Sequence, residues 1–164
     1  MNYNIKTVDK SDFDFILSLN QKTLPEVSST DLVGMSYFLK NSSYFKIILH
    51  NNHPVGFCIG LKPGKDYSSE NYIWINKRYN SFIYVDRIVI DEKYRNIGIG
   101  SYLYTHLVKT YYGKVENIIC EVNILPHNKP SINFHKKYGF KEIGQKDTEN
   151  GKKRVSYMMY KISL

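Results

Sequence analysis

A chain of 164 residues with 42% hydrophobic and 23% charged residues has the composition of a globular protein that buries a core. No apolar run approaches the roughly 18 residues that a membrane-spanning helix needs, so we do not expect a membrane protein. The two cysteines form no CxxC motif and predict no disulfide framework. The start of the chain has no secretory or transit signature, and we expect one cytoplasmic domain over residues 1–164.

The formal net charge of +8 raises the question of an anionic partner. A nucleic acid or a phosphorylated cofactor would each fit a basic protein. Most of the lysines are scattered singly, however, and no block of about five like charges forms a basic arm. The chain also lacks alanine and is rich in Lys, Asn, Ile and Tyr, which indicates an AT-rich coding bias as the source of the charge. We therefore do not expect nucleic-acid binding.

The N-terminal half predicts strands and helices in alternation. The expected strands lie at residues 3–8, 44–49 and 55–61, the last two as a hairpin. Ser11 with Asp14 predicts the capped start of a first helix, and Thr30 with Asp31 opens a second. Residues 63–80, PGKDYSSENYIWINKRYN, are expected to form a long aromatic-rich connection. Connections of that length are usually functional or disordered.

The C-terminal half continues the pattern. Its expected strands lie at residues 81–90, 117–122, 140–143 and 154–162. Apolar residues at helical spacing from Gly98 predict a helix after the first of these strands. Asn128 as N-cap, Pro130 in the first turn and Gly139 just past the end predict a last helix. The order β-α-α-β-β-β-α-β-α-β-β predicts an α/β protein with a mixed sheet.

The segment from Arg95 to Ser101, RNIGIGS, leaves a strand and enters a helix. Backbone amides at a helix N-terminus bind phosphate, and glycine lets the chain approach a ligand without a Cβ atom. A dinucleotide fingerprint is excluded because Leu103 stands where GxGxxG needs its third glycine. A P-loop is excluded because the motif GK[ST] is absent. The remaining pattern, R-x-x-G-x-G after an apolar strand, is a candidate pyrophosphate site.

Two linked segments stand out in the C-terminal half. The first is IVIDEKYRNIGIGSYLYTHL, which contains the glycine turn, and the second is CEVNILPHNKPSINFHKKYGFKEIG. Together they resemble the GNAT superfamily of acetyl-CoA-dependent N-acetyltransferases. The family's pattern of Asn, small residue, aromatic and Gly-Phe is matched in the second segment by Asn128, Ser131, Phe134, Gly139 and Phe140. The likeness covers residues 80–145 and is strongest to a little-characterised bacterial branch of predicted acetyltransferases.

The resemblance implies a single-domain GNAT fold, in which about seven strands form a central mixed, twisted sheet flanked by about four helices. It implies acetyl-CoA as co-substrate, and because the histidines show no metal-ligand spacing we expect no metal. The turn amides would hold the pyrophosphate, and a backbone N–H near Val89 or Ile90 would polarise the thioester carbonyl. The implied cofactor-binding residues are Ile88, Val89, Ile90, Arg95, Asn96, Ile97, Gly98, Ile99, Gly100, Ser101, Asn128 and Ser131.

Glu121 and His135 are the candidate catalytic residues that the resemblance implies. Glu121 occupies the strand position where some GNAT enzymes acting on protein N-termini keep the base that deprotonates the amine. A salt-bridged or solvent-facing glutamate is the alternative. Many relatives place a Tyr acid directly after the aromatic residue of the last helix, where this chain has His135. Its imidazole would either protonate the leaving thiolate or only contact CoA.

Three further features bear on the site. Asp86 beside Arg87 in mid-strand predicts either a structural buried pair or a carboxylate that faces the acceptor. The aromatic residues of the segment 63–80 either line an acceptor pocket or fold on one another. Cys120 is expected on the strand face opposite Glu121, and we do not expect it to act as a nucleophile.

The expected function is transfer of an acetyl group from acetyl-CoA to a primary amine, by direct attack in a ternary complex. The amine belongs either to a small molecule or to a protein N-terminus, and a homodimer, common in the family, is left open. The first alternative is a non-catalytic acyl-CoA-binding module, which the missing Tyr at position 135 leaves open. A basic nucleic-acid-binding domain is the less favoured alternative.

Overall fold

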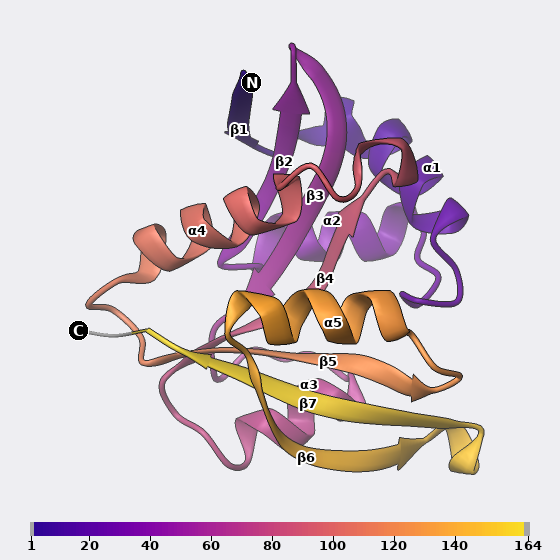
Figure 1. Ribbon diagram of the computed structural model, residues 1–164, viewed down its shortest axis with the longest axis vertical. Coiled ribbons are helices and arrows are strands. Elements are labelled where there is room, and N and C mark those ends of the chain that lie inside the picture. Colours follow the sequence, from indigo (N-terminus) through magenta and orange to yellow (C-terminus); the bar gives the residue numbers. More distant parts are fainter. Residues whose placement is uncertain (1, 163–164) are drawn as a thin grey trace. The chain divides into compact units, whose positions relative to one another are not determined.

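The computed structural model describes residues 2–162 and shows a mixed α/β protein (Figure 1). The strands are β1 (Tyr3–Thr7), β2 (Tyr44–His50), β3 (His53–Leu61), β4 (Phe82–Ile90), β5 (Asn117–Leu125), β6 (Lys141–Thr148) and β7 (Lys153–Lys161). The α-helices are α1 (Phe13–Lys22), α2 (Leu32–Asn41), α3 (Glu70–Asn76), α4 (Ile99–Tyr111) and α5 (Lys129–Tyr138). Short 3-10 turns lie at η1 (Lys10–Asp12), η2 (Glu92–Tyr94) and η3 (Glu149–Gly151).

The strands form a seven-stranded sheet in the order β1-β2-β3-β4-β5-β7-β6. β4 and β5 run parallel, whereas β1–β2, β2–β3, β5–β7 and β6–β7 are antiparallel, so the predicted mixed sheet is confirmed. The predicted element order also holds, with one addition. The segment 63–80, expected as a loop, contains the helix α3, which was not predicted from its aromatic-rich sequence.

The chain divides into two compact units. The first contains the chain up to Leu61 together with Arg87–Thr110, and the second contains Lys62–Asp86 together with the chain from Tyr111 onward. β4 contributes residues to both units. The expectation of a single domain over residues 1–164 stays a prediction.

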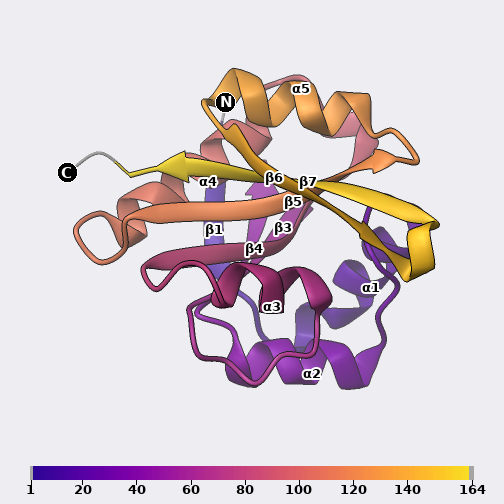
Figure 2. The same ribbon diagram turned by 90° about the horizontal axis from the view of Figure 1, so that it is seen from below.

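In the first unit, α1 and α2 lie on one face of the strands and α4 lies on the other (Figures 1 and 2). The hairpin turn between β2 and β3 places Asn51 and Asn52 at φ 49° and 64°, a left-handed conformation that asparagine tolerates. The start of the first helix differs from the prediction. Asp9 and Asp12 form the capping box in place of Ser11 and Asp14, because η1 precedes α1 by one turn.

In the second unit, α3 and α5 cover opposite faces of the strands β5, β7 and β6 (Figure 2). α5 begins and ends as predicted. The Asn128 side chain accepts a hydrogen bond from the Ser131 amide, and Gly139 ends the helix at φ 117°. α3 begins at Ser69, whose hydroxyl accepts a hydrogen bond from the Tyr72 amide. The helix forms because Tyr72 and Ile75, three residues apart, bury their side chains together on the sheet side.

Candidate active site

The predicted pyrophosphate turn lies in the first unit, between β4 and α4. Asn96 and Gly98 adopt left-handed conformations at φ 63° and 90°, and α4 begins at the next residue, Ile99. A Cβ atom added to Gly98 would meet no atom within 4 Å, so the backbone lies open there. Free amides of a helix N-terminus beside an open backbone suit an anionic group. These residues therefore fit the phosphates that the sequence pattern predicts.

The side chain of Arg95 forms a hydrogen bond that connects this turn to β4. Its Nε donates a hydrogen bond of 2.9 Å to the carbonyl oxygen of Ile90, the last residue of β4. The Ile97 carbonyl accepts a hydrogen bond of 3.1 Å from the Tyr3 hydroxyl. Both contacts hold the turn in place from its two sides. The roles of Ile88, Val89 and Ile90 toward the cofactor stay predictions.

α5 carries the predicted residues Asn128, Ser131 and His135 in the second unit. His135 is 3% exposed, and its ring lies against Phe134 and Phe140 at centroid distances of 5.1 Å. Its Nδ1 lies 2.7 Å from the Ser131 carbonyl oxygen, to which the ring N–H donates. Burial lowers the pKa of His135 to about 4, so the imidazole is neutral near pH 7.

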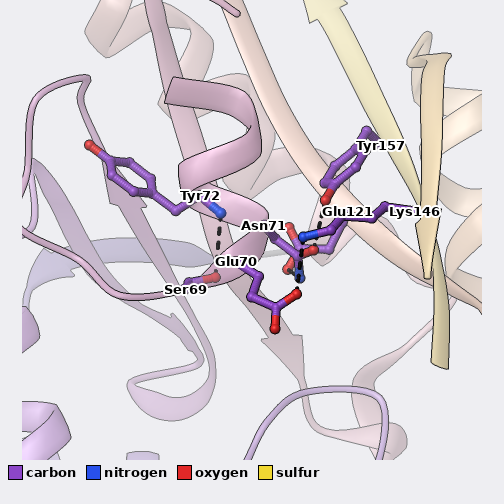
Figure 3. A network of polar contacts seen from close by, with 7 residues as sticks. All are labelled: Ser69, Glu70, Asn71, Tyr72, Glu121, Lys146 and Tyr157. Atoms are coloured by element: carbon purple, nitrogen blue, oxygen red, sulfur yellow. Dashed lines mark hydrogen bonds and ion pairs between the residues drawn. The ribbon is translucent and has the colours of Figure 1, made fainter. Parts of the chain in front are cut away.

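Glu121 lies on β5 and faces α3 (Figure 3). Its Oε1 accepts hydrogen bonds from the Asn71 side-chain amide at 3.1 Å and from the Tyr84 hydroxyl at 3.0 Å. Its Oε2 is shielded from solvent and has no hydrogen-bond partner among the described residues. A buried, unpaired carboxylate oxygen costs free energy, and its retention favours a functional role.

The pKa of Glu121 is raised to about 8, first by burial and then by the nearby charge of Asp86. The hydrogen bonds from Tyr84 and Asn71 act in the opposite direction, since they stabilise the ionised carboxylate. A carboxyl group with a pKa near the working pH is suited to take up and release a proton.

The register of the second unit explains why these groups meet. Tyr84 pairs with Ile119 across the parallel ladder, and Glu121 pairs with Tyr157 across the antiparallel one. Because side chains alternate along a strand, Tyr84, Glu121 and Tyr157 share one face. α3 covers that face and adds Asn71. Figure 2 shows α5 on the opposite face, so the structure does not bring Glu121 and His135 together.

The neighbouring pair Asp86 and Arg87 separates into two environments. In the second unit, Asp86 accepts a hydrogen bond from the Tyr67 hydroxyl. In the first unit, Arg87 is 5% exposed and donates from Nη1 to the Asn20 side chain at 2.8 Å and to the Ser28 carbonyl at 3.0 Å. The hydrogen bonds of Arg87 tie α1 and the following loop to β4, which is a structural role.

Sequence reasoning missed Asn71, Tyr84 and Tyr157. Asn71 was hidden because its segment was expected to be a loop. The two tyrosines lie in correctly predicted strands, but nothing in the sequence states which strands are neighbours or in which register. Cys120, by contrast, is buried and forms no disulfide within residues 2–162. It lies one residue before Glu121 and therefore on the opposite face, as expected.

The sequence matches the acetyltransferase (GNAT) family over residues 13–140. The chain belongs to the GNAT family of acetyltransferases. A spermine/spermidine N(1)-acetyltransferase of Bacillus subtilis (strain 168) is 30% identical to this GNAT protein over 162 residues, 93% of this chain and 96% of the relative. An N-alpha-acetyltransferase of Sulfurisphaera tokodaii is 26% identical over 146 residues, 86% of this chain and 81% of the relative.

The fold is also that of solved acetyltransferase structures. The crystal structure of NAA60 of Arabidopsis thaliana in complex with acetyl-CoA matches at a TM-score of 0.76 and 18% identity, over 98% of this chain and 100% of that chain. The GNAT fold predicted from the sequence is thus confirmed. The family match and the curated relatives show an acetyl-CoA-dependent N-acetyltransferase that acts on an amine.

Within residues 2–162, none of the helices is long and apolar enough to cross a membrane. Within the same residues, no three or more His, Cys, Asp or Glu side chains are grouped to hold a metal ion.

Proposed function

We propose that this GNAT enzyme acetylates a primary amine with Glu121 as the general base. The observation that supports this assignment is the buried Oε2 of Glu121, which lacks a hydrogen-bond partner among the described residues while Oε1 has two donors. A free lone pair on a carboxylate with a pKa of about 8 is suited to receive a proton from an ammonium group, directly or through one water molecule.

The reaction balances as a single acyl transfer. Acetyl-CoA supplies an activated acetyl group whose thioester bond is broken. The acceptor ammonium gives one proton to Glu121, its nitrogen forms the new bond to the acetyl carbon, and the C–S bond breaks to release the thiolate. The attacking nitrogen loses its second proton to solvent, and the thiolate takes one proton from solvent. Glu121 then releases the proton that it took up to solvent, so each turnover yields the amide, the CoA thiol and one net proton, with Glu121 ionised again.

We assign the donor-binding groups in each unit separately. In the first unit, the backbone of Ile88–Ile90 would contact the pantetheine. The amides of residues 96–101 would hold the pyrophosphate, since the Arg95 amide already donates to the Glu92 carbonyl. The open backbone at Gly98 supports this assignment. In the second unit, Asn128 and Ser131 at the start of α5 would contact the cofactor, and Asn128 already caps that helix.

His135 stays a candidate rather than an assigned acid. A neutral imidazole is a weak proton donor, and the pKa of His135 is lowered to about 4 by burial. Its Nδ1 proton is also engaged by the Ser131 carbonyl. These contacts weigh against the acid role, and they leave the second role considered from the sequence, in which His135 only contacts CoA. A His135→Gln variant that keeps its turnover would support this second role.

The assignment of Glu121 is tested with Glu121→Gln, compared with Glu116→Gln as a matched control. Glu116 is exposed one residue before β5. We expect Glu121→Gln to lower kcat by about 10²–10⁴-fold, the usual contribution of a general base, while CoA affinity measured by calorimetry is unchanged. Release of free thiol from acetyl-CoA reports turnover with a peptide N-terminus and with a polyamine. Full turnover in Glu121→Gln would remove this residue from the mechanism.

The same assay separates the remaining alternatives. A non-catalytic acyl-CoA-binding module would bind CoA but release no thiol with any amine of a broad panel. A nucleic-acid-binding domain would bind RNA or DNA with a strong dependence on salt. The homodimer and the cytoplasmic location stay predictions, which sedimentation analysis and localisation of the tagged protein would test.

A further inference from the structure

The carboxylate of Glu121 is held asymmetrically. Asn71 and Tyr84 come from different elements, yet both donate to the same oxygen, Oε1. The other oxygen, Oε2, is left without a hydrogen-bond partner within residues 2–162. A carboxylate that rotated freely would expose either oxygen. Two donors on one side therefore select which oxygen faces the acceptor.

A hydrogen bond from Tyr157 fixes the orientation of the Asn71 side-chain amide. The Tyr157 hydroxyl donates a hydrogen bond of 2.9 Å to Oδ1 of Asn71, so the Nδ2 group must point to Glu121 (Figure 3). A flipped amide would place its oxygen against the carboxylate and its NH2 group against the tyrosine hydroxyl. The contact with the ionised carboxylate would then lose its donor, although the tyrosine hydroxyl could still accept from the NH2 group.

Tyr157 is in turn held by a layered stack. Its ring lies 4.0 Å from the Trp74 ring at an interplanar angle of 11°, and the guanidinium of Arg78 lies 4.0 Å from the same indole ring. Arg78 also donates to the Trp74 carbonyl at 3.0 Å. Gly144 of β6 leaves room for the indole, because a Cβ atom there would come within 3.2 Å of it. The stack seats α3 on β7 through stacking and cation–π contacts.

We propose that Asn71 is a positioning residue for catalysis, fixed by Tyr157 and the Trp74 stack, which holds Oε1 of Glu121 so that Oε2 faces the acceptor. This inference rests on the proposed role of Glu121 as base. It assigns to α3 the task of orienting that base. Asn71 itself need not touch the substrate.

The other charged and titratable groups around Glu121 set the background for a test by pH. Tyr84 and Asp86 face it from β4, and Tyr157 faces it from β7. On α3, Glu70 forms an ion pair with Lys146 of β6 at 3.0 Å. Loss of the Asn71 donor would destabilise the ionised form of Glu121, so its pKa would rise further.

The experiment combines a structural and a kinetic readout on the full chain. Carboxyl-carbon NMR of labelled glutamate follows the titration of Glu121 in Asn71→Ala and Tyr157→Phe, and kcat is measured from pH 6 to 10. We expect Asn71→Ala to raise both the titration midpoint and the rising limb of kcat by about one pH unit, the size of one hydrogen bond to a charged group. Tyr157→Phe keeps the stacked ring and should shift both in the same direction by a smaller amount.

Matched controls are Asn133→Ala, an exposed asparagine of α5, and Tyr160→Phe, a tyrosine of β7 that lies against Tyr138 of α5. Neither should move the titration of Glu121. If Glu121→Gln loses turnover but Asn71→Ala changes neither the titration midpoint of Glu121 nor the pH profile of kcat, the positioning role alone is overturned. Full turnover in Glu121→Gln would overturn the proposed base and the positioning role together.

Discussion

Glu121→Gln should stabilise the enzyme at alkaline pH while it lowers activity. A carboxyl whose pKa rises from 4.5 in the unfolded chain to about 8 in the fold holds its proton more tightly when folded. Its contribution to stability is therefore complete below pH 4.5 and is lost as the pH rises through 8. Gln resembles the protonated side chain and does not titrate, so the variant keeps this part of its unfolding free energy at alkaline pH.

The size of the effect follows from linkage. With pKa values of 4.5 and about 8, the wild type loses roughly 4 kcal/mol of unfolding free energy between pH 5 and pH 9 from this group alone. Urea unfolding of the wild type and Glu121→Gln at both pH values measures the loss, with Glu116→Gln as control. A stability difference between wild type and Glu121→Gln that is the same at pH 5 and pH 9 would refute a raised pKa.

Three further predictions address the other elements. The pKa of His135 is about 4 in the fold and 6.5 in the unfolded chain, so the unfolding free energy is highest above pH 6.5 and falls by roughly 3 kcal/mol toward pH 4. Urea unfolding of His135→Gln should show a smaller decrease over this pH range. Gly98→Val should weaken CoA binding, measured by calorimetry, because a β-branched residue is strained at φ 90°. A steric clash is not the cause, because no atom lies within 4 Å of the added Cβ atom. Gly144→Ala should displace the Trp74 ring by the few tenths of an ångström that a 3.2 Å contact requires, and because Trp74 is the single tryptophan, its fluorescence reports the change directly.

Local sequence signals predicted the parts of the fold that depend on neighbouring residues. Asp31 before an apolar repeat, Asn128 followed by Pro130, and Gly139 after the last apolar residue each act within one helical turn. Their positions were correct because capping and chain reversal are short-range effects. The start of the first helix was misplaced because two pairs of equal spacing, Asp9–Asp12 and Ser11–Asp14, compete there, and only Asp9–Asp12 forms the capping box.

The sequence by itself also identified Glu121 as a candidate, because it occupies the strand position where some members of the resembled family keep their catalytic base. It did not determine what surrounds the carboxylate. Asn71, Tyr84 and Tyr157 are 50, 37 and 36 residues away from it along the chain. No local pattern specifies which of them meets Glu121.

Tertiary structure decided the chemistry of this residue. The ladders of β5 with β4 and with β7 bring Tyr84 and Tyr157 to its face, and the Trp74 stack seats α3 above them. The same packing buries Oε2 and raises the pKa of Glu121 to about 8. A glutamate in the sequence is an ordinary acid, and only burial among long-range partners makes it a base poised near neutral pH.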